Sequence, residues 1–157
     1  MITIFLLISV AARAEFRIES LDHDFVAEVA DASAENKSLV IMFDQTGCPY
    51  CDKMRRRVIR NPAVDSYYSH HFVMVENNIR GALEVVSPDG KAMTQKELAR
   101  RLRIRATPVF LYLDKDGKEA LRLTGFLDAD LFVKAGEYVT NGVYKTGTSF
   151  YRYLQAK

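Results

Sequence analysis

Two cysteines, Cys48 and Cys51, enclose the dipeptide Pro49-Tyr50 and are the only cysteines in this 157-residue chain. A C-x-x-C pair is typical of a redox dithiol, but the same spacing also supplies half of a zinc site, so its surroundings must decide. The apolar, strand-forming run Ser38–Phe43 ends shortly before the motif, and residues 52–59 follow it with a helix-like pattern. The motif therefore lies where a strand passes into a helix.

The start of a helix favours a thiolate at Cys48. Unpaired backbone N–H groups and the positive end of the helix dipole lie there, and both stabilise an anion. A thiol that ionises readily is reactive near neutral pH. Pro49 suits the first helical position, because its missing N–H would have no partner there. Cys51 follows about one turn later and can attack a mixed disulfide formed at Cys48, which makes thiol-disulfide exchange the leading interpretation.

A second informative element is the pair Thr107-Pro108, directly before the strand-like run Val109–Leu113. A proline that opens a strand means little alone. Together with the C-x-x-C motif, the pair resembles the thioredoxin superfamily, in which a Thr-Pro or Ile-Pro pair with a cis peptide bond packs beside the two cysteines. The resemblance implies that Thr107 and Pro108 face Cys48 and offer backbone groups to a bound substrate, with Pro49 and Tyr50 as further support of the active site.

The resemblance extends from about Phe25 to Gly142 and follows the thioredoxin order of elements. The pattern predicts helices at 23–36, after Cys51, from Pro62, at 95–102 behind the capping box Thr94–Glu97, and between Asp128 and Asn141; it predicts strands at 39–43, 72–76, 109–113 and 119–123, the last two joined by a turn at 114–117. We therefore expect an α/β, thioredoxin-like fold, with a central mixed β-sheet flanked by helices on both faces.

Residues 1–14 differ from the rest of the chain. An apolar run is followed by Ala12-Arg13-Ala14, which places small residues where a signal peptidase cuts. We expect a signal peptide over residues 1–14 and a single thioredoxin-like domain over residues 15–157, although no Lys or Arg precedes the apolar run; an uncleaved anchor or a buried strand is the alternative. Export would place the protein in the bacterial periplasm or a similar compartment, where thiol oxidation is permitted.

Composition adds little. A chain with 48% hydrophobic and 27% charged residues is ordinary for a soluble globular protein, and a net charge of +2 does not indicate a nucleic-acid partner. No cofactor is predicted. Thioredoxin-like domains without an added dimerisation segment are usually monomers, so we expect a monomer.

The chain departs from cytoplasmic thioredoxin at two points. Met42 stands six places before the first cysteine, where cytoplasmic thioredoxin carries a buried aspartate. The proton acceptor for Cys51 is therefore unassigned, with Asp44 and Glu76 as candidates. The chain also has no tryptophan, whereas cytoplasmic thioredoxin carries one just before its motif.

The chain more closely resembles the exported thioredoxin-like group that includes the SoxW proteins of bacterial sulfur oxidation. The matching segments are Phe43–Cys51, Arg105–Val109, Thr124–Phe126, Gly142–Tyr144 and Ser149–Leu154. This resemblance implies a periplasmic reductase of protein disulfides, with a membrane thiol transporter as its source of electrons. The substrates could be sulfur-oxidation carrier proteins, apocytochrome c during haem attachment, or misoxidised proteins in general.

Two alternatives stay open. The direction of electron flow depends on the reduction potential, which the sequence does not provide, so the protein could instead be a periplasmic disulfide oxidase or isomerase. Cys48 and Cys51 could also hold a soft ion such as Cu(I) or Zn(II) in a metal carrier. No second C-x-x-C or spaced Cys/His pair completes a four-ligand zinc site, so no metal site is predicted.

Arginines cluster after the motif and before the Thr-Pro pair. Solvated helix faces explain most such runs, and docking of an acidic partner or an anionic substrate is the alternative. The two groups are Arg55, Arg56, Arg57 and Arg60, and Arg100, Arg101, Arg103 and Arg105. The adjacent histidines His70 and His71 are expected to be ordinary surface or helix-cap residues.

Overall fold

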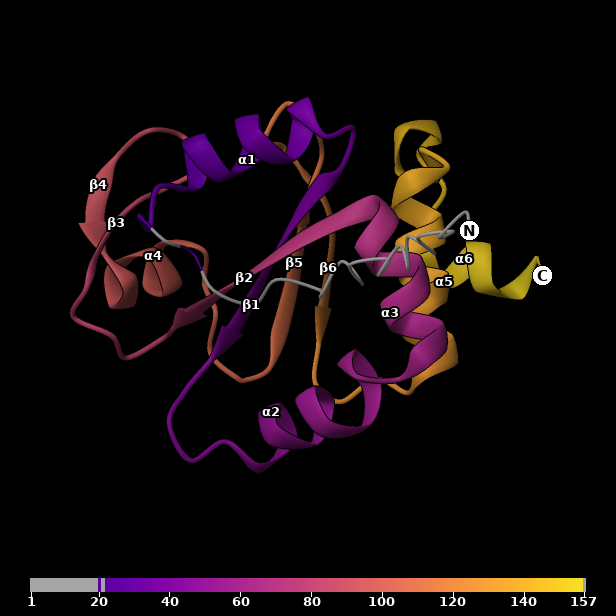
Figure 1. Ribbon diagram of the computed structural model, residues 1–157, viewed down its shortest axis with the longest axis horizontal. Helices are drawn as coiled ribbons and strands as arrows, with labels where there is room; N and C mark the ends of the chain where they lie inside the picture. The colour runs from indigo at the N-terminus through magenta and orange to yellow at the C-terminus, as the bar shows by residue number, and fades with distance from the viewer. Residues whose placement is uncertain (1–19, 21, 157) are drawn as a thin grey trace, which may run out of the picture.

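The computed structural model describes residues 20 and 22–156 and shows a central sheet with helices on both faces (Figure 1). The four strands lie in the order β2-β1-β5-β6; they are β1 (Ser38–Asp44), β2 (Phe72–Asn78), β5 (Val109–Leu113) and β6 (Glu119–Thr124). Strand β1 is parallel to β2 and antiparallel to β5, and β5 is antiparallel to β6. The predicted mixed sheet of a thioredoxin-like fold is thus confirmed. The predicted signal peptide at residues 1–14 lies outside the described residues.

Strand β1 lies inside the sheet, and its side chains from Leu39 to Phe43 are buried. Successive side chains of a strand point to opposite faces, so β1 contributes to two separate cores. We call the first the α1–α4 core, because Phe25 of helix α1 (Phe25–Ala34) and Leu98 of helix α4 (Gln95–Arg101) close it. It consists of Phe25, Leu39, Ile41, Phe43, Val75, Val85, Leu98, Ala99, Ile104, Val109, Leu111 and Leu113.

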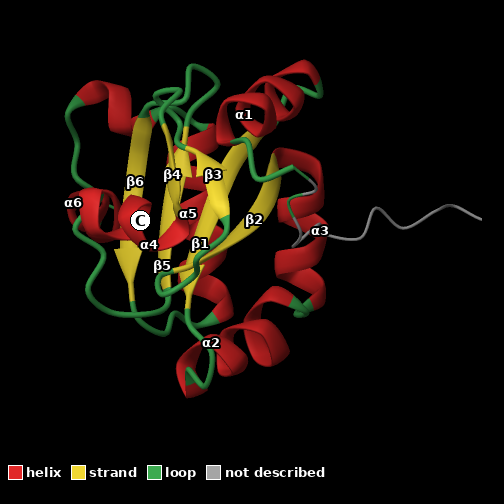
Figure 2. Ribbon diagram, turned by 90° about the vertical axis from the view of Figure 1, so that its left-hand side faces the viewer, coloured by secondary structure: helices red, strands yellow, loops and turns green. Residues whose placement is uncertain are grey.

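The second core, here called the dithiol core, fills the opposite face of the sheet. Its helices are α2 (Pro49–Met54), α3 (Pro62–His71) and α5 (Ala129–Thr140), and the π-helix η1 (Arg55–Ile59) continues α2 without a break. Figure 2 shows α2 at one end of the sheet, below the strands. The buried members are Val40, Met42, Cys48, Cys51, Met54, Val58, Ile59, Val64, Tyr68, Phe72, Met74, Phe110, Tyr112, Leu127, Phe132, Ala135, Tyr138 and Val139.

Side-chain caps define where the helices begin. The carboxylate of Asp24 accepts hydrogen bonds at the start of α1, Asn61 caps α3, and Asp128 caps α5. The predicted capping box of α4 is also present: the Thr94 hydroxyl accepts from the Glu97 N–H at 3.2 Å, and the Glu97 carboxylate accepts from the Thr94 N–H at 2.8 Å. These local signals place the helix starts as the sequence predicts.

Four elements were not predicted. A short hairpin, β3 (Glu84–Val86) with β4 (Ala92–Thr94), forms a separate two-stranded sheet, and the chain ends in a 3-10 helix, η2 (Val143–Thr146), and helix α6 (Phe150–Gln155). The hairpin strands carry little signal because each has three residues, and only Val85 among them is buried. Among the described residues, no helix combines the length and apolar character needed to cross a bilayer.

Candidate active site

The two cysteines form a disulfide at the junction of β1 and α2, with their Cα atoms 5.3 Å apart. Cys48 is the N-cap of α2, and Pro49 takes the first helical position, as the sequence predicts. The backbone N–H of Cys51 donates a hydrogen bond to the sulfur of Cys48 at 3.1 Å. This N–H would also stabilise negative charge on the same sulfur once the disulfide is reduced.

Both cysteines are buried, but only Cys48 is next to exposed side chains. Cys51 is 0% exposed, whereas Cys48 is 5% exposed. Tyr50 is 59% exposed although it is a large aromatic residue, and Pro49 is exposed as well. A disulfide of another protein can therefore approach Cys48 across this surface, while Cys51 lies behind it.

Thr107 and Pro108 lie next to Cys48, directly before β5, and the peptide bond between them is cis. The Thr107 hydroxyl donates a hydrogen bond to the Cys48 sulfur at 3.2 Å. The carbonyl oxygen of Pro108 accepts a hydrogen bond from the N–H of Gly125 at 2.8 Å, which connects this loop to the end of β6. The structure thus brings together the two segments that the resemblance singles out, 59 residues apart along the chain.

The position of Met42 is apolar in this protein. Met42 is completely buried in the dithiol core, together with Cys51 and Met54. The sulfur of Met54 accepts a long hydrogen bond from the N–H of Leu127 at 3.4 Å. Neither methionine has an ionisable side chain. Strand β1 therefore presents a thioether to the interior at the place where cytoplasmic thioredoxin carries a carboxyl group.

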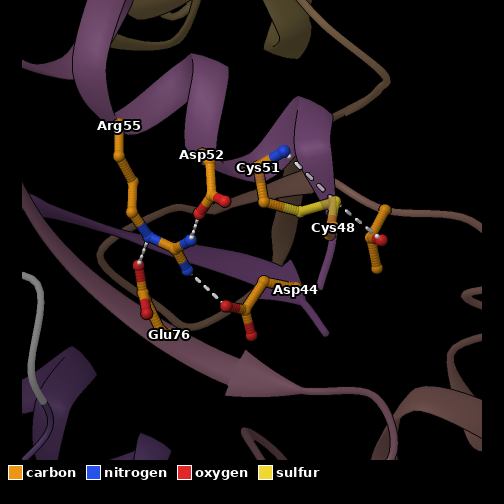
Figure 3. Close-up of a disulfide and its surroundings, with 7 residues drawn as sticks. Asp44, Cys48, Cys51, Asp52, Arg55 and Glu76 are labelled. Atoms are coloured by element: carbon orange, nitrogen blue, oxygen red, sulfur yellow. Dashed lines mark hydrogen bonds and ion pairs between the residues drawn. A yellow bond between two sulfur atoms is a disulfide. The ribbon is translucent and has the colours of Figure 1, made fainter. Parts of the chain in front are cut away.

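Carboxylates are nevertheless present near the dithiol, where they surround Arg55 (Figure 3). The Arg55 guanidinium donates to Glu76 at 2.8 Å, to Asp52 at 3.3 Å, and to Asp44. The hydrogen bond that Arg55 donates to Glu76 raises the pKa of Arg55 well above its ordinary value; burial opposes this shift, and the charges of Glu76 and Asp44 add to it. We call Asp44, Asp52, Arg55 and Glu76 the Arg55 cluster.

The Arg55 cluster corrects the interpretation of Arg55 as part of a solvated helix face. Its side chain is only 26% exposed and joins three elements. The ion pair between Asp52 and Arg55 could have been predicted from their i,i+3 spacing on a helix. The ion pair with Glu76 could not, because Glu76 lies on a separate strand, β2. Asp44 and Glu76, the candidate proton acceptors, both bind this guanidinium.

The other arginines after the motif, Arg56, Arg57 and Arg60, are exposed, as expected for a solvated helix face. In the second group, Arg100, Arg103 and Arg105 are exposed and Arg101 forms an ion pair with Asp89.

One contact at the rim of the site could not be read from the sequence. The ammonium group of Lys53, on α2, lies 4.0 Å from the ring centre of Phe126, which precedes α5. A cation over an aromatic face is attracted by the ring electrons. This pair links the helix that carries Cys51 to the loop after β6.

The adjacent histidines serve local roles. Nδ1 of His70 lies 2.7 Å from the carbonyl oxygen of Ser66, and the His71 ring packs against Tyr67 with ring centres 4.6 Å apart. In the part of the chain that the structure describes, no group of three or more His, Cys, Asp or Glu residues is arranged to hold a metal ion.

Comparison with known proteins agrees with this geometry. A family model described as a thioredoxin-like domain matches residues 25–140. Among solved structures, a thioredoxin-fold protein from Helicobacter pylori is 24% identical, with a TM-score of 0.68 over 77% of this chain and 81% of the other. A thioredoxin from Thermus thermophilus is 26% identical, with a TM-score of 0.60 over 80% and 87% of the two chains. A putative disulphide-isomerase from Bacteroides thetaiotaomicron is 23% identical, with a TM-score of 0.59 over 82% and 95%. No curated protein matches the chain.

Proposed function

Because the chain belongs to the thioredoxin-like domain family and carries the Cys48–Cys51 disulfide, it is a thiol-disulfide oxidoreductase, and we propose that it reduces disulfides of exported proteins. The observation that carries the assignment of roles is the place of Cys48 at the start of α2, beside the exposed residues Pro49 and Tyr50, with Cys51 at 0% exposure behind it. Cys48 is reachable and receives hydrogen bonds from the Cys51 N–H and the Thr107 hydroxyl, whereas Cys51 is fully enclosed. Cys48 is accordingly the nucleophile and Cys51 the resolving cysteine.

Reduction proceeds in two exchanges. The Cys48 thiolate attacks one sulfur of the substrate disulfide, which forms a mixed disulfide and releases the first substrate thiolate. The Cys51 thiol then loses its proton and attacks the Cys48 sulfur, which restores the Cys48–Cys51 disulfide and releases the second substrate thiolate. Two electrons pass from the protein to the substrate, and a dithiol donor must return them before the next cycle.

The protein surface around Cys48 fits a peptide substrate. Exposed Tyr50 supplies an aromatic contact beside the sulfur, and the Thr107-Pro108 loop offers its backbone on the other side. The Pro108 carbonyl is already bonded to Gly125, so backbone groups of Thr107 are the ones available to pair with an extended chain. The resemblance to thioredoxins supports this mode of binding.

The proposed compartment is the periplasm, and the proposed reductant is a membrane thiol transporter. The apolar residues 1–11 and the small residues that follow support export, and the segments shared with the SoxW group support a reductive role there. In this setting the substrates are disulfide-bearing proteins of sulfur oxidation or of cytochrome c maturation. Fractionation of the native host, with the mature N-terminus read by mass spectrometry, tests the location directly.

The reduction potential of the Cys48–Cys51 couple tests the direction. Equilibration in dithiothreitol or glutathione buffers should give a value near that of thioredoxin, about −270 mV. A value near about −120 mV would assign the protein to the oxidases instead. In parallel, catalysis of insulin reduction by dithiothreitol is expected, whereas retention of one Cu(I) or Zn(II) through desalting, without catalysis, would indicate a metal carrier.

A further inference from the structure

The Arg55 cluster connects the chain segments before and after the dithiol. Asp44 ends β1 and Arg55 opens η1, so their ion pair joins the two ends of the segment that contains Cys48 and Cys51. Glu76 anchors the same guanidinium to β2, and the carbonyl oxygen of Asp44 accepts from the N–H of Ile79 at 2.9 Å. The active-site segment is therefore connected to β2 by the side chain of Arg55, in addition to this backbone hydrogen bond at its start.

The charges of the Arg55 cluster also lie close to the cysteines. Arg55 follows Cys51 by four residues, which places the two side chains on neighbouring turns, and Asp52 directly follows Cys51 (Figure 3). Asp44 is only 15% exposed, and Arg55 and Glu76 are each 26% exposed, so their charges are less screened than in water. The carboxylates of Asp44, Asp52 and Glu76 all bind the guanidinium of Arg55.

Several other neighbours of the dithiol are uncharged. Thr107 contributes a neutral hydroxyl, Met42 and Met54 are thioethers, and Lys53 points to the ring of Phe126. A thiolate at Cys48 is stabilised by nearby positive charge and destabilised by nearby negative charge. The balance between Arg55 and its carboxylates therefore bears on the stability of the reduced form.

We propose that Arg55 is a positioning residue that offsets the charge of Asp44 and Glu76 beside the dithiol, and thereby sets the acidity of Cys48 and the reduction potential of the couple. Without the guanidinium, the carboxylates would repel the Cys48 thiolate and favour the disulfide. Without one carboxylate, the Cys48 thiolate and the reduced form of the protein would become more stable. This inference rests on the oxidoreductase activity and not on the proposed direction of electron flow.

The test compares Arg55→Met and Asp44→Asn, which both break the same ion pair but change the charge in opposite senses. The reduction potential is measured in dithiothreitol buffers, and the ionisation of Cys48 by the ultraviolet absorbance of its thiolate. Arg55→Met should lower the equilibrium constant for reduction about tenfold, equal to about 30 mV toward more negative potential, and raise the pKa of Cys48. Asp44→Asn should shift both quantities the opposite way.

Arg57→Met is the matched control, because it removes the same charge from the same helix at an exposed position. Its equilibrium constant for reduction should lie within about twofold of the wild-type value, since exposed charges are screened. Arg55→Lys keeps the charge and should stay close to the wild type, and with Asp44→Asn it decides the question if Arg55→Met does not fold.

Shifts of Arg55→Met and Asp44→Asn in the same direction would show a purely structural clamp and overturn the proposal, as would a shift no larger than that of Arg57→Met. A wild-type potential in the oxidase range would overturn only the proposed direction, because the differences between variants do not depend on it.

Discussion

The α1–α4 core and the dithiol core share the strands of one sheet but contain different chemistry. The hydrophobic members of the α1–α4 core are all hydrocarbon side chains, and the buried polar residues Glu28, Asn77 and Gln95 come from α1, β2 and α4. On the dithiol side the buried members include two cysteines, three methionines and three tyrosines, some of them joined by hydrogen bonds. Both cysteines thus belong to one layer of the fold, and the other layer contains neither of them.

The largest effects should follow from the cysteines. Cys48→Ser removes the nucleophile, so we expect the rate of insulin reduction to fall by more than about 100-fold. Cys51→Ser keeps the nucleophile but cannot resolve, so it should accumulate a mixed disulfide with a substrate, visible on a non-reducing gel. Full disulfide-reducing activity in Cys48→Ser would contradict the assigned roles.

The next effect tests the α1–α4 core. Leu111 is buried there in the middle of β5, and Leu111→Ala should lower the free energy of unfolding by about 2–5 kcal/mol because it leaves a cavity. Urea unfolding of the oxidised protein measures this loss. The reduction potential should equal that of the wild type, since this layer does not contact the dithiol.

Met42→Ala is the matched change on the other face. Met42 is equally buried, so a comparable loss of stability is expected, but its cavity opens beside the cysteines. Its reduction potential should therefore change as well. If Leu111→Ala shifts the potential as much as Met42→Ala does, the two layers are not functionally separate.

A smaller effect is expected from the buried tyrosines of the dithiol core. The Tyr68 hydroxyl donates to the carbonyl oxygen of Phe132 at 2.6 Å and shares a 2.8 Å hydrogen bond with the Tyr112 hydroxyl. Tyr68→Phe leaves these partners unsatisfied, so unfolding should become easier by about 1–3 kcal/mol at neutral pH. Urea midpoints of the two proteins give the difference.

The same pair predicts a dependence on pH. Burial raises the pKa of Tyr68 well above the ordinary 10.0. The folded protein therefore holds the proton more tightly than the unfolded chain, so stability is fully present below about pH 10 and is lost as the pH rises further. Tyr68→Phe should lose stability less steeply above that pH, and an unchanged slope would show that the tyrosine does not contribute.

The smallest effect concerns the cap of α4, on the hydrocarbon side. Thr94→Ala removes one acceptor of the capping box and should cost about 1 kcal/mol of unfolding free energy. Thr94→Ser keeps the oxygen and serves as the control. Thermal unfolding should separate the two variants, and equal melting temperatures would show that the cap is not needed here.

Local patterns made most of the fold predictable from the sequence. The β1 run, the capping box of α4 and the turn before β6 each depend on residues close together in the chain, so spacing alone identifies them. The β3–β4 hairpin was missed although its loop, Ser87–Gly90, contains a recognisable Pro-Asp-Gly turn signal. Three-residue strands leave too few alternating positions to register as strands.

Contacts between distant segments explain the rest. The C-x-x-C motif and the Thr-Pro pair were predicted as a unit only through family resemblance, because Cys48 and Thr107 are 59 residues apart and no local pattern encodes their contact. The place of Arg55 was mispredicted for the same reason: its partner Glu76 is 21 residues away on another strand. Sequence spacing describes one helix or strand at a time, whereas the site is formed where several of them meet.

The complete enclosure of Cys51 also determines how the protein resists oxidants. A peroxide that enters the reduced site meets Cys48 first and converts its thiolate to a sulfenic acid. The thiol of Cys51, one turn away, condenses with that group to give the disulfide and water before further oxygen can be added. Such oxidation therefore ends in the ordinary disulfide form of the protein, which a dithiol can reduce again.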